Sequence, residues 1–344
     1  MSESISNRNG PNWVFRLAAA ALLIPLVAGL AWILMMIQMP LRSYSRPLLP
    51  LSSTQSEMKD RLSTEVKYLS ETIGERNVWR AGSLQVVVDY LRSNLQQSGY
   101  AVKQQTYRVE DQEMSNLEAT IPGSESLGET VVVGAHYDTV AGTVGADDNA
   151  TGVAAVLELA RHFRESKPRK TIHFVIFVNE EPPFFQTSRM GSRVYAQQLR
   201  RENIRVSAVL SLEMLGFYSD VPGSQKYPAL LNLFYPNRGN FIGFVGNLES
   251  RNLVRQSVRA FRESTSFPSE GIAAPAEWPG IGWSDQWSFW QERYPAIMIT
   301  DTALFRYPYY HTPLDTADRL DFDSMARVVE GVQRVVESLS TSQD

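Results

Sequence analysis

The chain has 344 residues, enough for one large α/β domain or two modest ones. Its hydrophobic content of 43% and charged content of 20% are typical of a globular protein with a sizeable core. A net charge of −4 and the lack of a nucleic-acid-binding motif exclude a nucleic-acid partner. Because the sequence has no cysteine, disulfides and thiolate metal ligands are also excluded, and any metal must be held by nitrogen and oxygen.

The first predicted element is an apolar run from Leu17 to Ile37, without charged or polar side chains. At helical rise it spans roughly 30 Å, about the thickness of a bilayer's hydrocarbon core. A cleaved signal peptide is the alternative, but the run is longer than a usual signal h-region and no small-x-small cleavage site follows it. We therefore predict a single-pass transmembrane helix at 17–37, preceded by a short tail at 1–16.

The orientation of this helix follows from its flanks, where arginines on both sides nearly balance the positive-inside rule. A short basic head before a long translocated segment is the usual layout of a signal anchor. The sequence therefore favours a membrane protein whose main domain lies on the extracytoplasmic side.

After the helix, residues 38–56 contain several prolines and serines and predict an extended linker. One domain is then predicted over 57–344. Apolar periodicity and turn residues predict its elements. In chain order they are helices at 57–73 and 83–97, strands at 100–109, 117–121 and 130–135, a helix at 152–163, a strand at 171–178, a helix at 193–200, strands at 206–212 and 295–300, and a helix at 322–339.

The alternation of strands and helices predicts a mostly parallel sheet covered on both faces. In such sheets, functional sites gather at the carboxyl ends of the strands. Four acidic or histidine residues lie just after the ends of three predicted strands, and they are His136, Glu180, Glu181 and Glu213. The sequence therefore places these side chains along one edge of the sheet.

Together with two further residues, this edge supplies what a pair of hydrolytic zinc ions requires, which is two histidines and three carboxylates. Asp147 lies in a turn just before a helix, and we predict that it bridges two metal ions. His136 and Glu213 would complete one metal site, and Glu181 and His311 the other.

Two more acidic residues are expected to act beside the metals. Asp138 is predicted to bond the far ring nitrogen of His136 and so fix its tautomer. Glu180 cannot easily bind the same ion as Glu181, because neighbouring residues of an extended segment point in opposite directions. Glu180 is therefore predicted to be the general base, which takes a proton from water and passes it to the leaving amine.

These motifs resemble the M28 family of zinc aminopeptidases over roughly residues 60–340, and they occur in the family's order. The segments that carry the resemblance are 135–139 (AHYDT), 145–149 (GADDN), 179–181 (NEE) and 310–316 (YHTPLDT). The resemblance implies a three-layer α/β/α sandwich with a mostly parallel mixed sheet and two co-catalytic zinc ions. It assigns His136, Asp147, Glu181 and His311 as ligands, Glu180 as base and Asp138 as the histidine-orienting residue. It also implies a cis peptide bond after the bridging aspartate, at Asp147–Asp148.

Aromatic residues near the predicted ligands are candidates for the substrate pocket. They are Tyr218, Phe305, Tyr309 and Tyr310. A second aromatic group, at 283–290, is attributed to packing, which explains aromatic side chains more often than ligand binding does.

The leading hypothesis is a membrane-anchored dizinc exopeptidase that removes N-terminal residues from peptides. Cobalt or manganese would fit the same nitrogen and oxygen ligands. Carboxypeptidase and dipeptidase action stay open. A single-zinc glutaminyl cyclase with a similar fold is the first alternative. A non-catalytic, receptor-like ectodomain is the second, and the intact ligand set argues against it.

Overall fold

The computed structural model describes residues 12–124, 128–228 and 231–341, although for several residues between 12 and 30 it describes the backbone alone. The chain divides into two compact units, Met1–Gln38 and Met39–Asp344. The described part of the first unit consists of helix α1, Asn12–Ile37, which covers the run predicted to be helical. A search of the described residues finds no helix with the length and hydropathy of a membrane span. The predicted tail at 1–16 lies mostly outside the described residues.

The second unit is built on one mixed sheet of eight strands in the order β1-β2-β4-β3-β5-β8-β6-β7. Strands β4, β3, β5 and β8 run parallel to one another, as do β6 and β7, whereas β1, β2 and the β6–β8 pair are antiparallel to their neighbours. This confirms the predicted mixed, mostly parallel sheet. The strands are β1 Val102–Val109, β2 Gln112–Ile121, β3 Glu129–His136, β4 Thr171–Phe177, β5 Arg205–Glu213, β6 Ile242–Gly246, β7 Ser269–Ala273 and β8 Ala296–Thr300.

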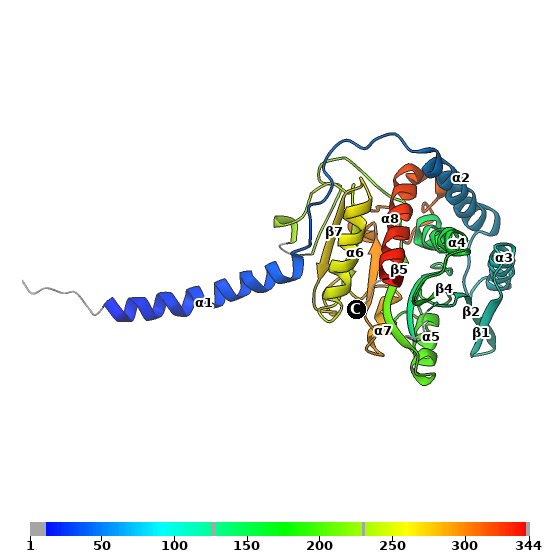
Figure 1. Cartoon of the computed structure of the whole chain (residues 1–344), viewed down its shortest axis with the longest axis horizontal. Coiled ribbons are helices and arrows are strands. Elements are labelled where there is room, and N and C mark those ends of the chain that lie inside the picture. The colour runs from blue at the N-terminus through cyan, green and yellow to red at the C-terminus, as the bar shows by residue number, and fades with distance from the viewer. Residues whose placement is uncertain (1–11, 125–127, 229–230, 342–344) are drawn as a thin grey trace, which may run out of the picture. The chain divides into compact units, whose positions relative to one another are not determined.

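Helices cover both faces of this sheet. The longer helices are α2 Ser53–Lys67, α3 Ser83–Gln97, α4 Gly152–Phe163, α5 Gly191–Arg201, α6 Arg251–Ser264 and α8 Phe322–Thr341, and α7 is a short helix at Gln286–Trp290. In Figure 1, α6 and α8 lie side by side over the sheet. The apolar side chains of α2, α3, α4, α6 and α8 share one core cluster, and those of α5 and α7 share another.

Strand β3 shows why two cores form. Successive side chains of a strand point to opposite faces, and Val131 and Val133 belong to the larger core whereas Val132 belongs to the smaller one. All three are fully buried, as expected for a central strand covered on both sides. The expected three-layer arrangement follows from this alternation.

The carboxyl ends of the parallel strands lie at one edge of the sheet, which positions the candidate site. Strand β3 ends at His136, which pairs in register with Phe177 at the end of β4. Glu213 is the last residue of β5 and pairs with Thr300 at the end of β8. The expected convergence at one sheet edge is therefore present.

The region 38–56, predicted to be an extended linker, instead contains the start of a helix and a segment that packs on the domain. Ser52 caps helix α2 through a reciprocal pair of bonds with Gln55, so the helix begins inside the predicted linker. Residues 39–50, here called the strap, are extended but docked on the domain. Arg262 donates hydrogen bonds to the carbonyls of Pro40 and Leu41, and Arg327 donates one to the carbonyl of Leu49. These contacts make the strap part of the second unit.

Candidate active site

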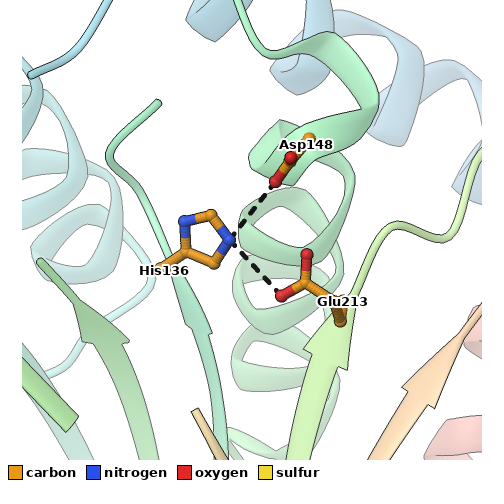
Figure 2. Close-up of side chains that lie close together, drawn as sticks. All are labelled: His136, Asp148 and Glu213. Carbon is orange, nitrogen blue, oxygen red and sulfur yellow. Dashed lines mark ion pairs between the residues drawn. The ribbon is translucent and has the colours of Figure 1, made fainter. Parts of the chain in front are cut away.

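His136 is the centre of the first group of potential metal ligands. Its Nε2 lies 3.4 Å from an Asp148 carboxylate oxygen and 3.3 Å from a Glu213 carboxylate oxygen (Figure 2). The three side chains come from the end of β3, the turn before α4 and the end of β5. All three residues are buried, and the ligand atoms lie within 4.8 Å of one another.

A second group forms around His311 and shares Asp148 with the first. The Nε2 of His311 lies 3.1 Å from the other oxygen of Asp148 and 3.4 Å from an oxygen of Glu181. Each oxygen of the Asp148 carboxylate therefore faces a different histidine. One carboxylate shared by two ligand groups is the arrangement that a bridged pair of metal ions requires.

The prediction that Asp147 is the bridge is not what the structure shows, because the shared residue is Asp148. The carboxylate of Asp147 turns away from the histidines and accepts hydrogen bonds from the Gly216 amide, at 2.9 Å, and the Thr151 hydroxyl, at 3.2 Å. The backbone explains the difference, since Asp148 and Asn149 have non-helical dihedral angles inside an otherwise helical turn. The cis peptide bond expected at 147–148 is found one residue later, at Asp148–Asn149.

Asp315 holds this turn in place. Its two carboxylate oxygens accept hydrogen bonds from the amides of Asp147, at 2.8 Å, and Asp148, at 3.1 Å. The Tyr307 hydroxyl donates a further bond at 2.9 Å. Asp315 lies four residues after His311, so one segment supplies both a candidate ligand and the anchor of the shared aspartate. Asp315 belongs to the 310–316 motif, but the sequence alone predicts no role for it.

Asp138 lies where it can orient both His136 and the glutamate pair. The Nδ1 of His136 is 3.1 Å from the backbone carbonyl of Asp138 and 3.6 Å from its carboxylate. A hydrogen bond from Nδ1 to this carbonyl directs the Nε2 lone pair toward Asp148 and Glu213. The carboxylate of Asp138 accepts bonds from the amides of Glu180 and Glu181, both at 3.1 Å.

Glu180 is close to the ligands but belongs to neither group. Its carboxylate lies 3.9 Å from the Nε2 of His136, farther than the oxygens of Asp148 and Glu213. Burial raises the pKa of Glu180 well above its ordinary value, and the charges on Glu181 and Glu213 add to the effect. A buried carboxyl group with a raised pKa beside a ligand group can accept and release a proton.

The buried carboxylates of the site are destabilised by burial and by one another, so a bound positive charge would stabilise them. Burial and the neighbouring charge of Asp148 raise the pKa of Glu181 to about 8. Burial also raises the pKa of Glu213. Burial alone would lower the pKa of His311, but Asp148 and Glu181 outweigh it and raise that pKa to about 10. The buried acids thus favour bound protons, or cations in their place.

The donor set fits divalent metal ions. Each group offers one imidazole nitrogen and two carboxylates, which are the ligands that zinc takes in hydrolytic sites. The Nε2 atoms of His136 and His311 are buried and make no hydrogen bond within the described structure. A buried nitrogen without a hydrogen-bond partner is costly, and coordination to a metal would satisfy it.

Three further residues that the sequence analysis did not identify support the site. Ser284 donates a 2.6 Å hydrogen bond to the Glu213 carboxylate. Asn149 donates a 3.3 Å bond to the same carboxylate and a 2.8 Å bond to the Leu212 carbonyl, so it fixes the end of β5. No periodicity or spacing in the sequence distinguishes such residues from other serines and asparagines.

Arg76 is the third of these residues. It is fully buried, and its guanidinium donates to five backbone carbonyls around the site. They are those of Leu69, Gly74, Tyr137, Val144 and Gly145, at 2.7–3.0 Å. Burial lowers the pKa of Arg76 to about 10, which keeps it charged at neutral pH. Arg76 therefore fastens both ends of the loop between His136 and Asp148.

An apolar pocket opens beside the first ligand group, with Glu213 and Tyr310 in its wall. Its other walls include Phe244, Ile272, Met298 and Phe305. Trp283, which the sequence analysis attributed to packing, also lines it and stacks on Phe305 with ring centroids 6.5 Å apart. The pocket and its opening to solvent hold about 850 Å³ of empty space, enough for a bulky side chain, and the candidate metal ligand Glu213 borders it.

Of the four aromatic residues predicted to bind substrate, Phe305 and Tyr310 line this pocket, and Tyr310 stacks on His311. The other two have packing contacts instead. Tyr218 lies edge-on to Phe267 and donates its hydroxyl to the Leu215 carbonyl. Tyr309 contacts Tyr307 and the guanidinium of Arg319.

Comparisons with solved structures identify the fold. The zinc aminopeptidase BSAP of Bacillus subtilis superposes with a TM-score of 0.66 at 15% identity, covering 86% of this chain and 97% of that chain. The glutaminyl cyclase of Fimbriiglobus ruber superposes with a TM-score of 0.62 at 19% identity, covering 86% of this chain and 98% of that one.

Comparisons of sequence identify the family. The chain is 38% identical to the uncharacterized protein YfbL of Escherichia coli over 82% of this chain and 88% of YfbL. It is 28% identical to a probable leucine aminopeptidase of Arthroderma otae, over 75% of this chain and 63% of that protein. The model of peptidase family M28 matches residues 116–336, which include every ligand of both groups. The chain therefore belongs to peptidase family M28, a family of zinc metallopeptidases and aminopeptidases.

Proposed function

We propose that this protein is a co-catalytic dizinc exopeptidase that removes N-terminal residues from peptides. The observation that carries the proposal is the shared position of Asp148 between two ligand groups, His136–Glu213 and Glu181–His311. Two groups joined by one carboxylate favour a metal pair over the single zinc of the cyclase alternative. Cobalt or manganese would be accepted by the same donors.

When bound, the metals would polarise the scissile carbonyl and lower the pKa of the attacking water. The chain's own residues would do the rest. Glu180 is buried, and its carboxylate lies 3.9 Å from the Nε2 of His136. This carboxylate accepts the proton of the attacking water and passes it to the nitrogen of the leaving amine. Asp138 holds the Glu180 and Glu181 amides and so keeps the base aligned with the ligands.

The apolar pocket supports the assignment of the substrate side chain. Because Glu213 and Tyr310 line the pocket, a side chain placed in it would bring the adjoining peptide bond beside the ligand groups. The free amine of an N-terminal residue would then lie among the acidic side chains, which favour a cation. The pocket's apolar walls favour large apolar N-terminal residues.

A small panel of peptides tests this proposal. The zinc-loaded chain is incubated with a peptide that has a free N-terminus, its N-acetylated form and its C-terminally amidated form, and products are followed by mass spectrometry. Loss of single residues from the free and amidated peptides, with none from the acetylated one, is expected. Cleavage from the carboxyl end would refute the aminopeptidase assignment, and cyclisation of an N-terminal glutamine without hydrolysis would favour the cyclase.

We also propose that residues 17–37 anchor the protein in a membrane, with the peptidase domain on the extracytoplasmic side. The support is the uninterrupted apolar sequence of this segment. The test is to fractionate cells that express the chain. The protein should sediment with membranes, stay there in alkaline carbonate and be released by detergent, and its domain should be digested by protease added outside the membrane. Release by carbonate would contradict the anchor.

A further inference from the structure

One wall of the apolar pocket is formed by β7, which lies at the edge of the sheet next to β6. Glu270, Gly271 and Ile272 of β7 line the pocket, Gly271 through its backbone. The side-chain position of Gly271 faces the opposite way, because side-chain positions alternate along a strand. A Cβ atom on Gly271 would come within 2.9 Å of the Met39 sulfur and 3.0 Å of a Val258 methyl group in α6. The strap thus packs against the back of this wall through Met39.

The strap also occupies the outer edge of β7. An edge strand leaves a row of backbone groups without a strand partner. Here the amide of Ser269 donates a 2.9 Å hydrogen bond to the Ser43 hydroxyl. The Tyr235 hydroxyl donates a 2.7 Å bond to the Gly271 carbonyl. The edge is therefore covered by side chains, and the strap supplies one of them.

Arg262 of α6 joins the strap to the same strand. Its guanidinium donates to the carbonyls of Pro40, at 3.1 Å, and Leu41, at 3.0 Å. It also binds Ser269 and lies 3.6 Å from the Glu270 carboxylate. Glu270 borders both the pocket and a groove lined by strap residues 43–48, and Ser43 acts on its carboxyl group by lowering a pKa that burial raises. One wall residue is thus fixed from the strap side.

We propose that Met39 and Ser43 of the strap are specificity-determining residues of the peptidase. They position β7, and through Glu270 and Ile272 they set the depth of the pocket that receives the N-terminal side chain. The inference rests on the proposed function only in assigning that side chain to the pocket. Neither residue contacts the ligand groups, so each acts through the strand and not on the reacting atoms.

The test compares two pairs of variants in the full chain loaded with zinc. Met39→Ala and Ser43→Ala remove the contacts with β7. Leu41→Ala and Ser45→Ala are matched controls on the same strap, because Leu41 is 54% exposed and Ser45 is also exposed. The KM and kcat values are measured on phenylalanine and alanine anilides, and amide hydrogen exchange is followed in 269–273.

We expect Met39→Ala and Ser43→Ala to raise KM for the phenylalanine substrate about 10-fold, which is the low end of the roughly 10- to 200-fold by which a hydrophobic pocket distinguishes side chains that differ by one methylene. Values of kcat, KM for alanine and zinc content should not change. Exchange in 269–273 should become faster. The two controls should match the wild-type chain, and a proportional loss on both substrates would indicate general damage and overturn the inference.

The test distinguishes failure of the inference about Met39 and Ser43 from failure of the proposed function. If the wild-type chain hydrolyses no anilide, the proposed function fails. Calorimetric binding of phenylalaninol and alaninol to the same variants then tests whether Met39 and Ser43 set the depth of the pocket. A wild-type chain that does not prefer phenylalaninol, or variants with unchanged preference and unchanged exchange, would overturn the inference. If Ser43→Ala does not fold, Met39→Ala and its control provide the same comparison.

Discussion

Asp147 and Asp148 are adjacent acids with different surroundings. Asp148 faces both histidines, whereas Asp147 faces Gly216 and Thr151. We expect Asp148→Asn to reduce the zinc content from about two per folded chain to below one, because both ligand groups lose a carboxylate. Asp147→Asn is the matched control and should retain the metals. Zinc is measured by atomic absorption on dialysed protein, and metal loss from the Asp147 variant alone would reverse the assignment.

The neighbouring glutamates allow a second paired experiment. Glu180→Gln should lower kcat about 100-fold or more while zinc content stays at the wild-type level, because a general base is lost without a ligand. Glu181→Gln should instead release zinc. Both variants keep the side-chain shape, so steady-state kinetics with metal analysis separate the two roles. Near-normal turnover by the Glu180 variant would exclude it as the base.

At this scale the sequence predicted most of the site's composition but not its detail. His136, Glu181, Glu213 and His311 follow from their order and from the strand ends, and the structure brings them together around one aspartate. Which aspartate of the pair turns inward depends on the local backbone, which residue types do not determine. Supporting residues such as Ser284 carry no sequence signal because they act only through tertiary contacts.

At the scale of elements, the sequence predicted the central strands and helices well, because long apolar runs have clear periodicity. The segment from β6 to β7 was not predicted. Its strands are short and contain Gly243, Gly246 and Gly271, which weaken a strand pattern. The strap was predicted as a linker because its prolines and serines are also typical of a flexible segment.

Arg76 is the clearest case of one side chain that holds several elements together. Arg76→Met should lower the free energy of unfolding by about 3 kcal/mol or more, because five backbone carbonyls, three of them buried, lose their donor. Arg80→Met is the control, since its side chain is 62% exposed and its ion pair with Glu75 contributes little. Urea unfolding measures both, and equal midpoints for the two variants would contradict this role.

For the whole molecule, the buried acids make stability depend on metal and pH together. Without metal, Glu181 keeps its proton up to about pH 8 in the folded state, although an unfolded chain releases it near 4.5. Protonated His311 also stabilises the folded state, because its pKa is raised from 6.5 to about 10 on folding. This stabilisation is fully present below about pH 6.5 and is lost as the pH rises toward 10. The stability of the metal-free protein should therefore fall as pH rises from about 5.

Metal affinity has the opposite dependence on pH and should increase as pH rises, because the ligands must be deprotonated to coordinate a metal ion. The difference in Tm between zinc-loaded and chelator-treated protein should therefore be larger at pH 8 than at pH 5.5. Differential scanning calorimetry at the two pH values measures it. A difference that is constant or shrinks with pH would show that these carboxylates and histidines do not hold the metal.

The spacing of the ligands along the chain has a consequence for biosynthesis. The first ligand group is complete only when Glu213 has been made, and the second needs His311, 98 residues farther on. A nascent polypeptide on the ribosome therefore has no paired metal centre until His311 has been translated. The hydrolase would stay inert during its own synthesis, without a separate inhibitory segment.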